Sequence, residues 1–254
     1  MNEKEIIPQT VQQDPWEHLK QFTRARIALG RTGISVPLKE TLQFKLAHAY
    51  AKDAVFSALD IPLLQQQLAV FDIPVLKVKS LNTNRQHYLQ RPDLGKKLTA
   101  NDEQQLQSHA KESDIAIVVA DGLSATAINQ HTAAILGLLI PLLLEKQYNL
   151  APIVLAEQAR VALGDEIATC LKAKLVIVFI GERPGLSVSD SLGVYITYKP
   201  SPGFTDEKRN CISNIHGEGL SYEGATRKIE YLVSESMRLQ LSGVQLKDND
   251  LLLL

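Results

Sequence analysis

Three runs of uninterrupted apolar, β-prone residues constrain the fold of this chain more than any other feature. They occupy residues 115–120 (IAIVVA), 153–155 (IVL) and 175–180 (LVIVFI). Strands without polar residues on either face are typical of parallel sheets that helices cover on both sides. The segments between the runs have the helical pattern that crossover connections require. The sequence therefore predicts an α/β fold with a Rossmann-like, mostly parallel sheet flanked by helices.

The first part of the chain has a different pattern. Apolar residues recur at helical spacing between residues 15 and 59, and residues 75–80 alternate like a half-exposed strand. Residues 84–95 are polar and contain Pro and Gly, which predicts a loop with a basic cluster. We therefore predict that residues 1–110 form a separate helical and mixed region.

Residues 111–254 are predicted to form the Rossmann-like domain. A weaker fourth strand is expected at residues 194–198, and an amphipathic helix at 226–241. The apolar tail at 251–254 is unusual, because an apolar terminus is normally covered by other protein surface.

Composition excludes several classes of protein. The formal net charge of −1 gives no overall field to attract nucleic acid. The longest apolar run, residues 135–144, is too short to span a membrane and contains Pro141. The polar N-terminus lacks the apolar segment of a signal peptide, which predicts a cytoplasmic protein. Two cysteines and six scattered histidines form neither a disulfide framework nor a metal-binding pattern.

Three polar segments follow predicted strands, where open α/β sheets bind their ligands. Residues 119–126 combine a glycine turn with a helix start, and residues 180–187 deliver Glu182 to the sheet edge. In residues 209–219, the small side chain of Cys211 allows a bulky ligand to approach the backbone. These segments predict polar recognition of a ligand.

Each segment also has a purely structural interpretation. Asp121 and Ser124 could end a strand and cap a helix. Glu182 and Arg183 could form a solvated surface pair of little energetic weight, and Cys211 could be a buried core thiol. The chain has no GxGxxG after the first strand, no GxxxxGK[ST], no HExxH and no GxSxG. Its residues therefore predict a ligand-binding α/β domain without an obvious active site.

The same segments resemble the small subunit of ethanolamine ammonia-lyase. Five short motifs occur in that family's order: ARIALGRTG (25–33), YLQRPDLG (88–95), ADGLS (120–124), GERPG (181–185) and NCISNIH (210–216).

This resemblance implies the small subunit of an adenosylcobalamin-dependent lyase, which converts ethanolamine to acetaldehyde and ammonia by a radical mechanism. It implies a hetero-oligomer with a large TIM-barrel subunit that holds the substrate, so no catalytic residue is expected in this chain. Cobalamin is expected between the subunits, in contact with Val161, Glu182 and Cys211. The N-terminal helices and the basic segment 85–91 are expected to contact the large subunit. The expected location is the cytoplasm, within a bacterial microcompartment.

One motif of other cobalamin-binding domains is missing. Many of them carry Asp-x-His-x-x-Gly after the first strand, and that histidine replaces the nucleotide base on cobalt. Here the strand is followed by Asp121-Gly-Leu-Ser124, while His216 lies too late in the chain. We therefore expect the cofactor to be bound base-on, with no protein ligand to the metal.

Two alternatives to the lyase remain. A Rossmann-like sheet could bind a nucleotide or NAD in an oxidoreductase, although the glycine fingerprint is missing. The absence of a catalytic constellation would also fit a non-catalytic scaffold subunit.

Overall fold

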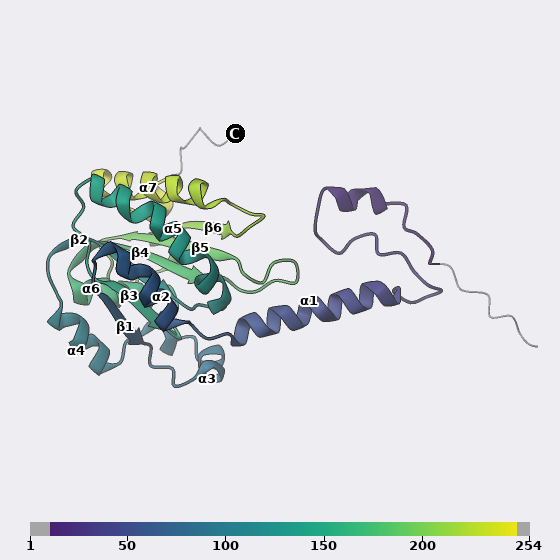
Figure 1. The fold of residues 1–254 in the computed structure, drawn as a ribbon, viewed down its shortest axis with the longest axis horizontal. Coiled ribbons are helices and arrows are strands. Elements are labelled where there is room, and N and C mark those ends of the chain that lie inside the picture. The colour runs from purple at the N-terminus through teal and green to yellow at the C-terminus, as the bar shows by residue number, and fades with distance from the viewer. Residues whose placement is uncertain (1–10, 248–254) are drawn as a thin grey trace, which may run out of the picture. The chain divides into compact units, whose positions relative to one another are not determined.

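The structure, a computed structural model, describes residues 11–247 (Figure 1). Contacts divide the chain into two compact units, Met1–Asp53 with Gly185–Val188, and Ala54–Pro184 with Ser189–Leu254. The expectation for the apolar tail at 251–254 lies outside the described residues. The helices are α1 (Leu38–Phe56), α2 (Ile61–Leu68), α3 (Arg85–Gln90), α4 (Ala100–Ser108), α5 (Ala125–Glu145), α6 (Leu163–Leu171) and α7 (Tyr222–Leu239).

The second unit contains a six-stranded sheet with the order β1-β3-β2-β4-β5-β6. The first four strands in this order are parallel, whereas β5 and β6 each pair antiparallel with the preceding strand. The prediction of a mostly parallel α/β fold is therefore confirmed. The strands are β1 (Val75–Lys79), β2 (Ser113–Ala120), β3 (Ile153–Glu157), β4 (Ala173–Gly181), β5 (Leu192–Tyr198) and β6 (Asn210–Ile215).

Helices cover both faces of this sheet, which explains the uninterrupted apolar strands. In β2, Ile115, Ile117 and Val119 pack against α2, α5 and α7, while Ala116 and Val118 point to the face covered by α4 and α6. Successive side chains of a strand alternate between the faces, so a strand between two helical layers needs apolar residues at every position.

Helix α5 is the most apolar helix of the described chain. It is long and apolar enough to cross a membrane by length and composition alone, but half of its most apolar window is buried inside the fold. It packs against the sheet and α7. It is therefore a core helix.

The predicted helical pattern of residues 15–59 is only partly realised. Helix α1 forms, but the earlier stretch contains only the short 3-10 helix η1 (Glu17–Gln21). Ala28, Gly30 and Gly33 have positive φ angles, which interrupt a helix. The predicted division at residue 110 stays a prediction, although β1, from the predicted first region, belongs to the sheet of the second unit.

Two segments predicted as loops form regular structure instead. Residues 85–90 form α3. Asn84 caps this helix by accepting a hydrogen bond from the His87 N–H at 2.9 Å, and the side chain of Tyr88, within the helix, is buried. Residues 210–215 form the edge strand β6 and not a loop after a strand. Pairing with β5 overrides the polar composition of this segment.

Candidate functional site

A pocket of about 340 Å³ lies at the carboxyl ends of the central strands. Its lining includes Gly122, which follows β2, and Glu182, which follows β4. Arg160 and Val161 reach it from the connection between β3 and α6, and Tyr195 from β5. Loops at this edge of a parallel sheet converge because all its strands run in one direction. The structure thus brings two predicted site residues, Val161 and Glu182, to one pocket.

Glu182 is held in place by the hairpin between β4 and β5. Its backbone N–H donates to the Ser191 carbonyl at 2.9 Å, and the Ser191 hydroxyl donates to Glu182 Oε2. Gly193 allows this geometry, since a Cβ there would lie 3.0 Å from Glu182 Oε1. Glu182 is thus an oriented, partly exposed acceptor. The solvated ion pair with Arg183 that we weighed from the sequence is not observed among the described residues.

Cys211 lies in β6 and lines a separate pocket of about 230 Å³. Its register partner across the β5–β6 pairing is Tyr195. Tyr195 therefore links Cys211 to the pocket that contains Glu182. Partial desolvation raises the pKa of the Cys211 thiol, which keeps it protonated at neutral pH although the residue is exposed. Because Cys211 is exposed, the core-thiol interpretation is wrong.

An arginine–tyrosine stack forms another side of the 340 Å³ pocket. The guanidinium carbons of Arg85 and Arg160 lie 4.7 and 4.3 Å from the centroid of the Tyr88 ring. The Tyr88 hydroxyl donates to the Ala159 carbonyl at 3.0 Å, and burial raises its pKa. Arg85 donates to the Gly122 carbonyl at 2.8 Å. This arginine is therefore an internal residue and not part of an exposed basic loop.

Asp121 and Ser124 have the structural roles that we considered from the sequence, at the end of a strand and the start of a helix. Ser124 is the N-cap of α5. The backbone N–H groups of Gln158 and Ala159 donate to the Asp121 carboxylate at 2.8 and 3.0 Å. Asp121 thereby fixes the start of the segment that carries Arg160. Burial raises its pKa to about 6, while the two N–H donors and Arg85 act in the opposite direction.

We expect Asp121→Asn to remove a pH dependence of stability. Between about pH 4 and 6, folded Asp121 holds a proton that the unfolded carboxyl, with a pKa near 3.9, has released. The proton on folded Asp121 therefore stabilises the wild type at low pH. This contribution to the free energy of unfolding is lost as the pH rises through about 6. Relative to Asp121→Asn, the wild-type free energy of unfolding should fall by up to about 3 kcal/mol between pH 4 and 7. Urea unfolding of both proteins measures this difference, and a difference that grows with pH would contradict it.

Several site residues were missed in the sequence. Arg160 precedes Val161 directly, and Tyr88 lies in the YLQRPDLG motif, but polar or aromatic residues in these places give no signal by themselves. Ser191 and Tyr195 become recognisable only through the pairing of β4 with β5 and of β5 with β6.

The fold and this site define an α/β protein with a pocket of mixed polar and apolar lining at the carboxyl edge of its parallel strands. Among residues 11–247, no group of three or more His, Cys, Asp and Glu side chains is arranged to hold a metal ion.

Residues 13–247 match the family model described as "Ethanolamine ammonia-lyase light chain (EutC)". The chain belongs to this family. The ethanolamine ammonia-lyase small subunit of Xanthomonas campestris pv. campestris is 50% identical over 245 residues, which cover 95% of this chain and 90% of the relative. The small subunit from Ralstonia nicotianae is 47% identical over 251 residues, 97% of this chain and 93% of the relative. The small subunit from Pseudomonas fluorescens (strain Pf0-1) is 50% identical over 240 residues, 93% and 88% of the two chains.

Proposed function

We propose that this chain is the small subunit of an adenosylcobalamin-dependent ethanolamine ammonia-lyase, and that it holds the corrinoid against a large catalytic subunit. Bound adenosylcobalamin would supply the radical chemistry that converts ethanolamine to acetaldehyde and ammonia. The chain's own residues would bind and orient the corrinoid and exclude water from it. The observation that carries the proposal is the joint placement of Val161 and Glu182 in one pocket, which is also lined by Tyr195, the register partner of Cys211.

The donors and acceptors of the site suit a corrinoid. A corrin ring carries amide side chains, whose N–H groups can donate to Glu182 because Ser191 holds its carboxylate in place. Val161 offers an apolar contact beside it, and Arg160 has a buried Nε without a hydrogen-bond partner among the described residues. A corrinoid is much larger than this pocket, which is consistent with a site completed by a second subunit.

The proposal includes base-on binding. His216 is buried, with Nε2 2.9 Å from Asn214 Oδ1, and its Nδ1 accepts from the Glu218 N–H at 3.3 Å. Both ring nitrogens are therefore occupied. Neither the 340 Å³ pocket nor the neighbouring 590 Å³ pocket is lined by a histidine. We also propose that the assembled enzyme acts in the cytoplasm, within a microcompartment.

We expect Glu182→Gln to weaken adenosylcobalamin binding about tenfold, because the charged acceptor of a hydrogen bond is lost. The chain is co-expressed with a matching large subunit, and binding is followed by corrinoid absorbance in the purified complex. Ammonia release from ethanolamine, with and without adenosylcobalamin, tests the activity of the same preparation.

The matched control is Glu112→Gln, an exposed residue next to the opposite end of β2. It should bind adenosylcobalamin like the wild type. A wild-type complex that binds no corrinoid and releases no ammonia would disprove the proposal. Equal affinities of the Glu182→Gln variant and the wild type would remove Glu182 from the site.

A further inference from the structure

Arg85, at the start of α3, is a largely buried cation that contacts three separate parts of the fold. Its side chain is only 12% exposed. Nε donates to the Val55 carbonyl in the last turn of α1 at 2.5 Å, and Nη1 donates to the Gly122 carbonyl, between β2 and α5, at 2.8 Å. The guanidinium also stacks on the ring of Tyr88. Arg85 does not itself line the candidate pocket, so it is placed to hold other segments.

The position of this side chain selects arginine over lysine. A guanidinium presents its N–H donors in one rigid plane, so it can bond the carbonyls of two different segments at once. The Val55 carbonyl belongs to the C-terminal turn of a helix, which favours a cation. Asp121 Oδ2 lies 3.8 Å from Arg85 Nη1 and adds an opposite charge. A lysine ammonium could keep the charge at this place, but it could not span both carbonyls.

The turn that Arg85 holds lies directly against the end of β4. Gly122 has a φ of 56°, and a Cβ on this residue would lie 2.2 Å from the Gly181 carbonyl oxygen. The Leu123 N–H donates to the same carbonyl at 2.9 Å. Glu182 is the next residue after Gly181. The position of the turn therefore fixes the place at which β4 delivers the Glu182 carboxylate.

The same turn also holds the segment that precedes α6. The carboxylate of Asp121, directly before Gly122, accepts from the N–H groups of Gln158 and Ala159. Gln158 has a φ of 54°, in the left-handed region that is unfavourable for a residue with a side chain. The two hydrogen bonds keep the chain in this conformation, and Val161 follows two residues after Ala159. The turn therefore positions Val161 as well.

We propose that Arg85 is a positioning residue for corrinoid binding, which sets the places of Glu182 and Val161 by holding residues 121–123 against the last turn of α1. This inference rests on the proposed function and extends it to a residue outside the pocket. Binding groups must be held within about 0.5 Å of their productive positions, so a turn that is free to shift weakens binding without any loss of a ligand contact.

The test uses Arg85→Lys in the complex with a matching large subunit. Hydrogen–deuterium exchange is measured without corrinoid, and adenosylcobalamin binding is then measured by absorbance titration. We expect faster exchange in residues 121–124 and 157–161 and unchanged exchange in α7, because only the local hydrogen bonds are loosened. We expect adenosylcobalamin binding to weaken about tenfold.

A double-mutant cycle with Glu182→Gln separates positioning from a general loss of structure. If Arg85 acts by placing the Glu182 carboxylate, its replacement matters less once that carboxylate is gone. Arg85→Lys should therefore weaken binding about tenfold in the wild type but less than about threefold in the Glu182→Gln background. The same factor in both backgrounds would overturn the inference.

The matched control is Arg238→Lys, the same change at an exposed arginine that also pairs with a carboxylate. It should leave exchange and binding at wild-type values. Unchanged exchange in both segments of Arg85→Lys, or faster exchange that extends through α7 and the whole sheet, would overturn the positioning role and leave the proposed function intact. A wild-type complex that binds no corrinoid would overturn the proposed function, while the exchange data would still show whether Arg85 holds the two segments.

Discussion

Arg209→Met is expected to lower the free energy of unfolding by about 3–5 kcal/mol, because it leaves the carboxylate of Asp165 buried without its partner. The two side chains are each only 1% exposed. Arg209 Nη1 and Nη2 donate to the two carboxylate oxygens of Asp165 at 2.8 Å each. Urea unfolding of wild type and variant at neutral pH measures the loss.

Two further variants show whether the buried charge is the cause. Arg238 also pairs with a carboxylate, Glu235, but is exposed. Arg238→Met should therefore change the free energy of unfolding by less than about 1 kcal/mol. Asp165→Leu/Arg209→Met, which removes both charges, should be more stable than Arg209→Met alone. If the double variant is the less stable one, an unpaired carboxylate is not the reason for the loss.

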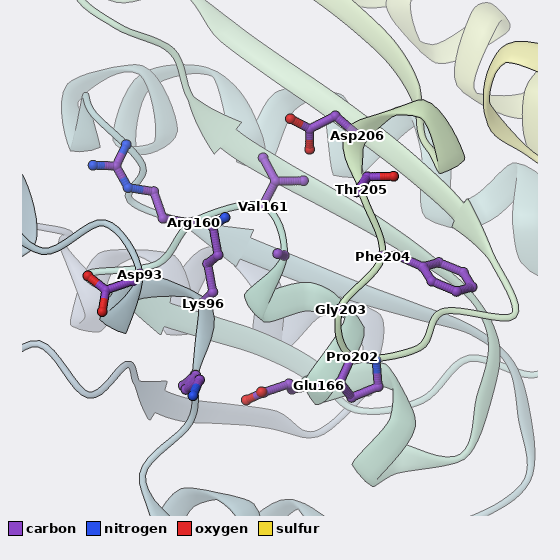
Figure 2. Close-up of a pocket in the computed structure, with 12 residues that line it drawn as sticks. Asp93, Lys96, Arg160, Val161, Glu166, Pro202, Gly203, Phe204, Thr205 and Asp206 are labelled. Carbon is purple, nitrogen blue, oxygen red and sulfur yellow. The ribbon is translucent and has the colours of Figure 1, made fainter.

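The Asp165–Arg209 pair also shapes a pocket of about 590 Å³ that shares Arg160 and Val161 with the candidate site. Arg209 Nη2 donates to the Phe204 carbonyl at 3.0 Å, which ties residues 202–206 to helix α6 through Asp165. These residues form one side of the pocket in Figure 2. The pair therefore positions that side of the pocket.

Gly181→Ala should destabilise the protein by roughly 3 kcal/mol or more, since there is no space for a side chain at this position. A Cβ on Gly181 would lie 1.9 Å from the Ser124 carbonyl oxygen and 2.8 Å from that of Asp121. Both neighbours are backbone atoms of the turn between β2 and α5, so they cannot rotate away. This close approach brings the end of β4 against that turn at the candidate site. Thermal and urea unfolding measure the effect.

Gly137→Ala is the matched control, because it makes the same chemical change in an open position. Gly137 is exposed in the middle of α5, and a Cβ on this residue would meet no atom within 4 Å outside the helix's own backbone. Alanine has the higher helix propensity, so this variant should gain about 0.5–1 kcal/mol. A similar loss in both variants would show that glycine at position 181 has no steric role.

The sequence by itself determined the class of fold. The runs at 115–120, 153–155 and 175–180 are apolar at every position, and only burial on both faces explains such strands. The structure confirms this for β2, β3 and β4. The sequence also indicated the sheet edge at which Glu182 lies, because loops after parallel strands converge there. Val161 was expected at the site only from the family resemblance. The apolar pattern of a strand is a local property of the chain, so a single sequence can reveal it.

Only the tertiary structure decided which distant residues complete the site. Asn84 and the burial of Tyr88 turn a polar segment into α3, and pairing with β5 makes residues 210–215 a strand. The link from Cys211 through Tyr195 depends on the register between β5 and β6, and the Asp165–Arg209 pair joins residues 44 positions apart. Contacts of this kind depend on how strands and helices pack together. Composition and local spacing do not reveal such contacts, because the two partners become neighbours only after the chain has folded.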